Sequence, residues 1–246
     1  MEQIRERQFL HNLYFYERMF NFEVYTLLQA MINCGSSILV HGRSGSGEDG
    51  LVSALFDAKS KSGSTLFIGD DSIVGLYPKR NIAEHRSAAG LLEASKVSSS
   101  DTIVVRGLNK ENVELFLSMC NSGQGLASVE SQSLNFVLDE VAELAASPSA
   151  DMLDLGVIDF VLTVEAHKLI SISEVVKDAG SYTIRPFAEY VRTNEYVFYS
   201  NVSEEKIQKM RQYNYEEAER FLLSIRTYEN AENPLFAIRS SDSIEA

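Results

Sequence analysis

The sequence predicts an α/β protein built on a mainly parallel β-sheet with an antiparallel extension. From residue 36 onward, short apolar runs alternate with segments of helical periodicity, which is the pattern of parallel strands joined by helices. A glycine-rich loop, residues 42–49, joins the first apolar run to a helical segment. A chain of 246 residues, 45% of them hydrophobic, is long enough for one large domain or for a medium domain with a helical appendage.

The chain begins with a stretch that favours helices. Residues 1–33 contain no glycine or proline and are rich in Phe, Tyr, Leu and Met, so we expect one or two helices there. The aromatic residues of this stretch are interpreted as packing surface rather than as a ligand site. The predicted strands that follow span residues 38–41, 65–69, 102–105 and 126–130. The predicted helices between them span residues 51–61, 83–95, 110–121 and 133–146.

The pattern changes after Ser147, Pro148 and Ser149, which interrupt the helical periodicity. Four apolar segments then follow with short turns between them, which favours an antiparallel extension of the sheet. They span residues 157–164, 169–175, 182–185 and 196–199. Residues 203–228 are predicted to be helical with a break near Asn214, and the end of the chain is polar and acidic. We therefore divide the chain into segments 1–34, 35–200, 201–231 and 232–246, the last being a flexible tail.

Composition argues against several classes of partner. The chain has 35 acidic and 22 basic residues, a formal net charge of -13. A nucleic-acid-binding surface or a surface that adheres to anionic lipid is normally basic, so neither is expected. An acidic surplus supports solubility or a basic protein partner.

The remaining sequence signals indicate a cytoplasmic protein without a metal site. Cys34 and Cys120 lie far apart and lack zinc-ligand spacing, so they are interpreted as buried free thiols. The four histidines show no mutual spacing typical of catalysis or metal binding, and a structural role is favoured for each. No apolar run approaches the length of a membrane span, and residues 1–7 lack the apolar core of a secretion signal.

The glycine-rich loop has the spacing of a phosphate-binding P-loop but not its chemistry. The signature requires two glycines with four residues between them, then lysine, then a hydroxyl residue. Glu48 stands at the lysine position and Asp49 at the hydroxyl position that binds Mg²⁺. The loop reads Gly42, Arg43, Ser44, Gly45, Ser46, Gly47, Glu48 and Asp49. The alternative is an ordinary turn rich in glycine and serine.

Charge reversal at the lysine position works against phosphate binding. In a working loop, backbone N–H groups hold the phosphates and the lysine neutralises their oxygens. At about 4 Å and an effective dielectric of about 20, each such interaction amounts to roughly 4 kcal/mol, so exchanging attraction for repulsion approaches roughly 8 kcal/mol before screening. We therefore expect ATP and Mg²⁺ binding to be weak or absent. A protonated Glu48 would oppose phosphate less, and Asp49 would remain able to ligate a metal.

Taken together, the segments of residues 27–191 resemble the motor ATPases of type II and type IV secretion, of pilus machines and of conjugation. Order and spacing agree across the whole stretch, which is more specific than any one motif. The resemblance implies a RecA-like P-loop NTPase fold. In that family an acidic Asp box, a Walker B strand ending in Gly-Glu and a Thr-Gly-His element follow the loop. The matching segments are residues 67–71, 101–105 and 121–124, with later strands at 157–161 and 172–175.

At most matched positions the family's chemistry is replaced. The first acid of the Asp box is Gly69, which leaves Asp70 or Asp71. Arg106 and Gly107 replace the Walker B Gly-Glu pair, so the carboxylate that would orient the attacking water is gone.

The histidine positions are replaced as well. Gln124 stands at the histidine of the Thr-Gly-His element, and Glu130 or a neighbour at the later histidine. Phosphoryl transfer depends on positioning and charge stabilisation, so this many losses indicate a pseudo-ATPase without catalytic residues.

Two hypotheses concern the residues that remain. Asp70, Asp71 and Asp101 are either relics of metal coordination or ordinary turn residues. Arg106 carries a positive charge where the family has an acid, and Glu48 a negative charge where it has a lysine. We therefore hypothesise an ion pair between Arg106 and Glu48 across the empty site.

The resemblance implies a cytoplasmic assembly role, with peripheral association at the inner membrane through a protein complex. The family carries an N-terminal domain before the motor domain, and residues 1–34 are too short to supply it. We therefore expect an adaptor subunit of a secretion, pilus or conjugation machine. It is expected to dock to an active motor ATPase, or to another cytoplasmic protein of the machine, through residues 1–33 and 203–228. A homo-oligomer or a hetero-oligomer is possible in either case. Two alternatives stay open: a nucleotide sensor that uses loop amides, Arg43 and Arg106, and an active ATPase with relocated catalytic groups.

Overall fold

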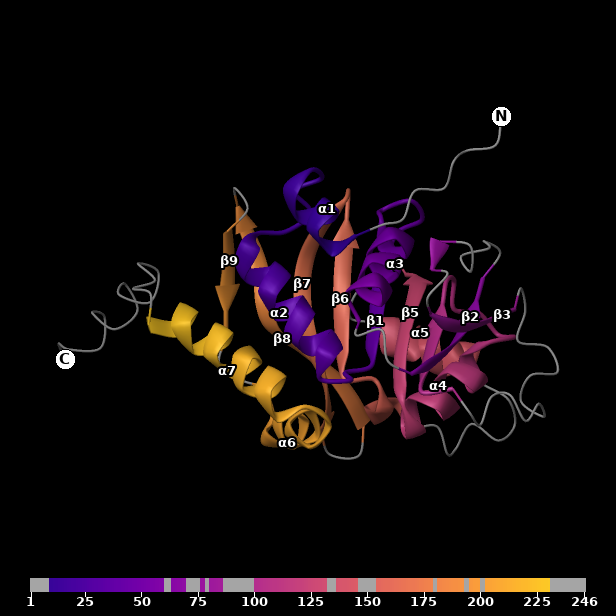
Figure 1. The fold of residues 1–246 in the computed structure, drawn as a ribbon. Helices are drawn as coiled ribbons and strands as arrows, with labels where there is room; N and C mark the ends of the chain where they lie inside the picture. Colours follow the sequence, from indigo (N-terminus) through magenta and orange to yellow (C-terminus); the bar gives the residue numbers. More distant parts are fainter. Residues whose placement is uncertain are drawn as a thin grey trace.

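The computed structural model describes residues 9–59, 63–69, 76–77, 80–85, 100–131, 136–145, 154–178, 181–192, 195–199 and 202–230. Its centre is a nine-stranded sheet with the order β3-β2-β4-β5-β1-β6-β7-β8-β9. The strands from β3 to β6 in this order pair in parallel, and β6 to β9 pair antiparallel. The predicted parallel sheet with an antiparallel extension is confirmed (Figure 1).

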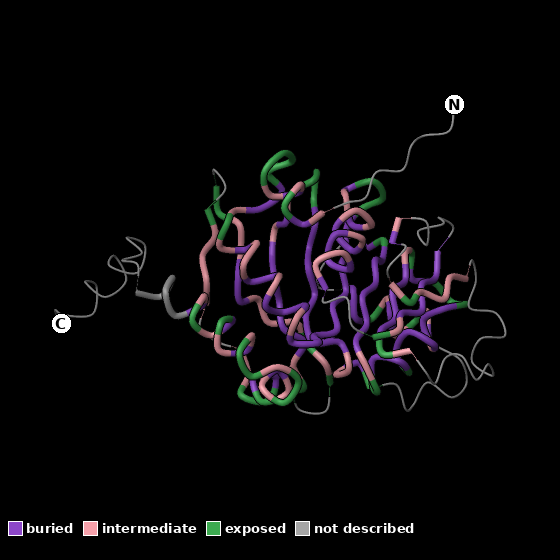
Figure 2. Tube along the Cα trace, viewed as in Figure 1, coloured by how far each residue is buried: buried purple, intermediate pink, exposed green. Residues whose placement is uncertain are grey.

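The parallel part of the sheet lies at the centre of the molecule. It consists of β1 (Ile38–Gly42), β2 (Ser64–Ile68), β3 (Asn81–His85), β4 (Thr102–Val105) and β5 (Gln124–Glu130), and β6 (Phe160–Glu165) completes it. All residues of β1 and β4 are buried, as expected for parallel strands covered on both faces (Figure 2). Ile38 and Val40 join one hydrophobic core and Leu39 joins the other, because alternate side chains point to opposite faces.

Helices cover both faces. The core on one face contains residues of α1 (Leu10–Phe15), α2 (Phe22–Asn33), α3 (Glu48–Ala58), α6 (Glu204–Tyr213) and α7 (Tyr215–Asn230). The core on the other face contains residues of α4 (Val113–Ser122) and α5 (Val137–Leu144). Figure 1 shows α2 and α7 side by side over the antiparallel part of the sheet. The amino-terminal and carboxy-terminal helices therefore meet although they lie far apart in the sequence.

The antiparallel part is made of β6, β7 (Lys168–Asp178), β8 (Ser181–Arg192) and β9 (Glu195–Phe198). Between β6 and β7, Ala166 and His167 both adopt positive φ angles, 46° and 60°. Two such residues in succession form the tight turn that suits the twist of a hairpin. This turn lies at the end of β6, next to the end of β1.

Local capping explains where several helices begin and end. The Asn21 side chain accepts a hydrogen bond of 3.0 Å from Val24 N at the start of α2. After α2, Gly35 adopts a φ of 71°, and a Cβ there would lie 2.5 Å from the Tyr213 ring. Asn214 ends α6, and its side chain accepts from Glu217 N in the first turn of α7 at 3.3 Å, so the predicted break near Asn214 is confirmed.

Two buried carboxylates hold α6 against the sheet. Asp159, before β6, accepts hydrogen bonds from Lys206 at 3.0 Å and from Lys209 at 2.7 Å. Glu174 on β7 is fully buried and accepts from Ser203, the residue that caps α6, and from Arg185 on β8. These contacts tie residues of α6 to strands more than 25 positions earlier in the chain.

Several predicted boundaries are wrong. Residues 83–85 belong to β3 and not to a helix, because residues 81–85 pair in parallel with β2; the rest of that predicted helix, 86–95, lies outside the described residues. The helix after the loop begins at Glu48 rather than at residue 51, because the loop ends at Gly47. Residues 155–157 form a 3₁₀ turn, η5 (Leu155–Val157), so β6 begins at Phe160. β8 continues to Arg192, well beyond the predicted residue 185.

Other predictions have mixed outcomes. Phe20 is fully buried, but Phe15, Tyr16 and Phe22 are exposed, so the aromatic stretch is packing surface only in part. The tail, residues 232–246, lies outside the described residues. Within the described part, no helix is long and apolar enough to cross a membrane.

Candidate functional site

The glycine-rich loop lies at the carboxyl ends of the parallel strands. β1 ends at Gly42, which is in register with Glu130 at the end of β5 and with Val164 near the end of β6. β4 ends at Val105, and Arg106 and Gly107 follow it. In open α/β sheets, ligands bind outside the carboxyl ends of the strands, so this edge is the first place to seek a site.

The loop has the backbone of a P-loop, and its glycines are required. Gly45 and Gly47 have φ angles of 76° and 105°, which residues with a side chain rarely adopt. A Cβ on Gly42 would lie 2.1 Å from the Ser46 hydroxyl, so only glycine fits beside the folded loop. The strand–loop–helix context predicted from the sequence is therefore present, and an ordinary exposed turn does not account for it.

The residue at the lysine position points into the loop. Glu48 is 6% exposed, and its Oε2 accepts a hydrogen bond of 2.8 Å from the hydroxyl of Ser46, which is also 6% exposed. The carboxylate therefore occupies the inside of the loop instead of reaching outward, as a lysine would to meet a phosphate. This arrangement places a negative charge among the groups that would otherwise attract an anion.

The residue at the hydroxyl position is held by two neighbouring strands. Asp49 accepts a hydrogen bond from the hydroxyl of Ser128 on β5, and its Oδ2 lies 3.4 Å from Nη2 of Arg106. Ser128 in turn accepts from the backbone N–H of Gly107 at 2.9 Å. The hypothesis of an ion pair between Arg106 and Glu48 is wrong, since among the described residues Arg106 pairs with Asp49. Glu48, the first residue of α3, bonds to Ser46 instead, and Asp49, the second residue, is the one that meets Arg106 at the end of β4.

The hairpin between β6 and β7 packs against the loop. His167 N donates to the Ser46 carbonyl at 2.9 Å, and a Cβ on Gly47 would lie 3.0 Å from the His167 ring. Met19, from the segment between α1 and α2, lies beside the same glycine and accepts from Leu169 N at 3.0 Å. Sequence reasoning missed Ser128, His167 and Met19, because their proximity to the loop follows from sheet order and not from any motif.

Two of the sequence-predicted positions, Gln124 and Asp101, lie at the opposite edge of the sheet. Gln124 is paired with Thr102 at the amino ends of β5 and β4, and Asp101 directly precedes Thr102. Gln124 is buried, accepts from Lys59 at 2.7 Å and donates to the carbonyls of Ile32 and Ser36. Burial lowers the pKa of Lys59. Gln124 therefore links α2, α3 and the sheet, away from the loop.

Asp101 is held in a turn. Its Oδ2 accepts from the backbone N–H of Ser64 at 2.9 Å, which joins the starts of β4 and β2. This contact favours the turn interpretation of Asp101 over a relic of metal coordination. Asp70 and Asp71 lie outside the described residues. Within the described part, no group of three or more His, Cys, Asp or Glu side chains is placed to hold a metal ion.

The histidine that precedes the loop belongs to the core. His41 is 3% exposed, and its Nε2 lies 2.9 Å from the hydroxyl of Thr163. The Ser171 hydroxyl donates a hydrogen bond to the same Thr163 oxygen. Burial lowers the pKa of His41 to about 4, so the ring is neutral at neutral pH. The structural interpretation of this histidine fits its surroundings.

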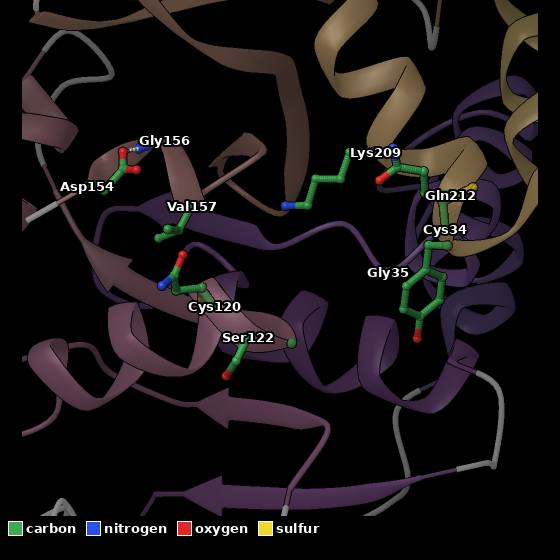
Figure 3. A pocket seen from close by; sticks show the side chains of 12 residues that line it. Cys34, Gly35, Cys120, Ser122, Asp154, Gly156, Val157, Lys209 and Gln212 are labelled. Atoms are coloured by element: carbon green, nitrogen blue, oxygen red, sulfur yellow. Dashed lines mark hydrogen bonds between the residues drawn. The ribbon is translucent and has the colours of Figure 1, made fainter. Parts of the chain in front are cut away.

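A pocket of about 490 Å³ lies at the amino edge of the sheet, far from the loop in the fold. It is bordered by the ends of α2, α4 and α6, with Cys34, Cys120, Lys209 and Tyr213 among its lining residues. Figure 3 shows Lys209 reaching across it toward Val157. Its lysine is already engaged by Asp159, and burial raises the pKa of each cysteine thiol to about 12. Neither the lysine nor the two thiols of this pocket are therefore poised for reaction at neutral pH, and the loop remains the candidate site.

Comparison with solved structures identifies the class of protein that shares this fold. Neither the protein-family models nor the curated protein sequences give a match. The fold is instead that of the ATPases of type IV secretion, as the predicted RecA-like P-loop architecture implies. The VirB11 ATPase from the Brucella suis type IV secretion system, solved in complex with sulphate, matches 82% of this chain with 17% identity and a TM-score of 0.51.

Two further similar structures are the ATPase DotB from Legionella pneumophila and from Yersinia pseudotuberculosis. The Legionella protein matches 91% of this chain with 10% identity and a TM-score of 0.49. The Yersinia protein matches 82% with 13% identity and a TM-score of 0.45. This chain spans 62% of the VirB11 chain and 58% and 53% of the two DotB chains. The identities are low, and the comparison with VirB11 establishes the fold alone.

Proposed function

We propose that this protein is a catalytically inactive relative of the secretion ATPases that serves as a structural or regulatory adaptor in a secretion, pilus or conjugation machine. The observation that carries the proposal is the occupation of the loop by its own carboxylates. Glu48 lies inside the loop and bonds to Ser46, while Asp49 is held by Arg106 and Ser128. The positions that would serve the phosphate and the metal are engaged in internal contacts.

Electrostatics supports weak or absent nucleotide binding. A nucleotide would have to approach the buried carboxylate of Glu48 and separate Arg106 from Asp49. The first step costs free energy because like charges repel, and the second because a half-buried ion pair is lost. Binding of a nucleotide to a lysine-bearing loop has neither cost. Arg43 is the one basic residue of the loop sequence, and it is exposed. The nucleotide-sensor alternative relies on the loop amides, Arg43 and Arg106, and the pairing of Arg106 with Asp49 counts against it.

The adaptor role rests on the fold and on the helices that surround it. The shared fold with VirB11 supports a related machine role, and the net charge of -13 favours a basic protein partner. The expected docking helices, α1–α2 and α6–α7, pack on the sheet, while Tyr16 and Tyr213 at their ends are exposed. These side chains are available for contact with an active motor ATPase or another cytoplasmic component.

The test is a calorimetric titration of the purified protein with Mg·ATP and Mg·ADP. We expect no binding heat and no nucleotide-dependent rise in Tm, because a ligand that binds only the folded state must stabilise it. The matched variant Glu48→Lys/Asp49→Ser restores the loop signature and should gain binding if the backbone is otherwise competent. Micromolar binding by the native protein would support the sensor alternative, and measurable ATP turnover would refute the proposal.

A second experiment addresses the adaptor role. The native protein is mixed with a lysine-bearing motor ATPase from the same organism, and complex formation is followed by size-exclusion chromatography with light scattering. A mixed complex of defined mass is the expected result. A homo-oligomer that excludes every such ATPase would contradict docking to an active motor.

A further inference from the structure

A second pocket lies at the amino edge of the sheet, where α6 and α7 meet the ends of α2 and α3. Its volume is about 470 Å³. It is lined by Asn33 of α2, Tyr213 of α6, Glu217 of α7 and Lys59, the residue that follows α3, among others. Lys59 is the one basic residue in this lining. The pocket therefore holds a single amine at the joint between the amino-terminal and carboxy-terminal helices.

The amine of Lys59 is buried and is held by neutral partners. The residue is 7% exposed, and its Nζ donates hydrogen bonds to Oε1 of Gln124 at 2.7 Å and to the hydroxyl of Tyr213 at 3.5 Å. Burial raises the pKa of the Tyr213 phenol, so this partner is uncharged at neutral pH. Among the described residues, no carboxylate forms an ion pair with Lys59. Lys206, by contrast, is buried to a similar degree and is paired with Asp159.

The carboxylates in the surroundings of this amine are engaged elsewhere. Glu217 is paired with Arg220 at 2.6 Å, and Asp101 accepts from a backbone N–H at the start of β2 at 2.9 Å. The guanidinium of Arg80, a like charge, donates to the carbonyl of Lys59 at 3.0 Å. Burial is the largest cause that lowers the pKa of Lys59; Asp101 raises it in part, and Arg80 lowers it further. The neutral form of the amine is therefore more accessible here than in a solvated lysine.

A neutral amine that borders a pocket is a nucleophile. A lysine that loses its proton in a desolvated site presents a lone pair, which attacks carbonyl carbon. An anion that merely pairs with an ammonium ion is less well served, because Glu217 lines the same pocket. Acylation suits the site better, since the resulting amide keeps one N–H for Gln124. It also removes a positive charge that is buried without a counter-charge, which is a costly arrangement.

We propose that Lys59 is a modification site whose amine accepts the acyl group of a small activated acyl donor, either an acyl phosphate or a thioester. Nζ attacks the acyl carbon and a C–N bond forms. The bond from that carbon to the leaving oxygen or sulfur breaks, and its electron pair departs with the phosphate or the thiolate. The proton that Nζ loses passes to solvent. The reaction requires no nucleotide and does not depend on the proposed adaptor function.

The direct test treats the native protein with acetyl phosphate or with the thioester S-acetyl-N-acetylcysteamine and follows each lysine by peptide mass spectrometry. Lys110, which is exposed and lies after the carboxyl end of β4, is the comparison. At neutral pH, Lys59 should be acetylated faster than Lys110 by at least one donor, and the donor that works identifies the source. The advantage should shrink at alkaline pH, where solvated amines also lose their protons. Acetylation of Lys59 no faster than that of Lys110, or only after denaturation, would overturn the proposal.

Matched variants test the cause of the reactivity. Asn33→Asp places a carboxylate in the lining of the pocket and keeps the shape of the side chain. A nearby carboxylate favours the protonated amine, and each unit by which the pKa rises lowers the neutral fraction about tenfold, so acetylation of Lys59 at neutral pH should slow by about threefold or more. Asn109→Asp adds the same charge at an exposed position after β4 and should leave the rate unchanged. An undiminished rate in Asn33→Asp would contradict the assignment.

The acetylated protein provides a structural check. Its far-UV circular dichroism and Tm should match those of the untreated protein, because the amide still donates to Gln124 and no charge remains to be buried. Circular dichroism and Tm of the two variants confirm in the same way that they are folded. A large fall in Tm that follows the acetylation of Lys59 would show that the acyl group does not fit the pocket, and the proposed site would be wrong.

Discussion

The buried cluster around Asp159 allows a quantitative prediction of stability. Asp159 is 2% exposed and accepts from Lys206 Nζ at 3.0 Å, from Lys209 Nζ at 2.7 Å and from the backbone N–H of Ser37 at 2.8 Å. The substitution Asp159→Asn keeps the shape and one acceptor but removes the charge. The Lys206 side chain, 9% exposed, is then left as a buried cation without a counter-charge.

The expected loss follows from that burial. Removing one partner of a buried ion pair costs about 3–5 kcal/mol, because the remaining charge stays desolvated. Since Asn can still accept from Ser37, we expect the lower end, about 3 kcal/mol, out of a typical total of about 5–15 kcal/mol. Lys209 is 43% exposed, so Lys209→Met should cost less than about 1 kcal/mol.

The measurement is urea unfolding at neutral pH, followed by far-UV circular dichroism, with the free energy extrapolated to water. The double variant Asp159→Asn/Lys206→Met removes both buried charges and should recover part of the loss, which shows as non-additivity. The reasoning is refuted if Asp159→Asn costs no more than Lys209→Met, or if the double variant is as unstable as the sum of its single variants.

Three further predictions concern buried groups. The pKa of His41 is about 6.5 in the unfolded chain and about 4 in the folded protein, so the unfolded state binds the proton first as the pH drops. The free energy of unfolding should therefore fall by about 3 kcal/mol between pH 6.5 and pH 4. The variant His41→Gln should lose this pH-dependent component, measured by unfolding at a series of pH values. Gly35→Ala should destabilise by about 2 kcal/mol, measured by urea unfolding, because the φ of 71° is strained for alanine and its Cβ would overlap the Tyr213 ring; an unchanged midpoint would contradict the packing. Burial raises the pKa of Cys34 and Cys120 to about 12, so neither thiol should react with Ellman's reagent until the protein is denatured; rapid reaction of the native protein would show that they are accessible.

Strong local patterns made most of the fold predictable. Apolar runs identified β1, β2, β4 and β5 to within two residues, because strands buried on both faces are continuously apolar. The helix break at Asn214 was predictable because asparagine is a residue type that commonly caps the start of a helix, as Asn214 does for α7. The strand at residues 81–85 was missed because Ala83, Glu84 and His85 continue a plausible helical pattern. Pairing with β2 outweighed that local preference.

The candidate site was predictable only in its loop. The spacing of Gly42 and Gly47 and the acids at 48 and 49 were visible without coordinates. The partner of Arg106 was not, because an ion pair between the end of β4 and the first turn of α3 depends on the orientation of that helix on the sheet. The same limit applies to Gln124, which the motif order associated with the loop but which the register of β5 places at the other edge of the sheet.

The sequence by itself determined that this chain folds as an α/β protein and that its glycine-rich loop carries an acidic residue, Glu48, where a P-loop carries lysine. Both could be seen without coordinates because apolar periodicity, glycine spacing and residue type are local properties. Only the tertiary structure decided which groups engage those charges. Glu48 meets Ser46, Asp49 meets Arg106 and Ser128, and the β6–β7 hairpin packs on the loop. Strand order and register bring together residues as far apart as 49 and 128, and neither can be read from a local pattern.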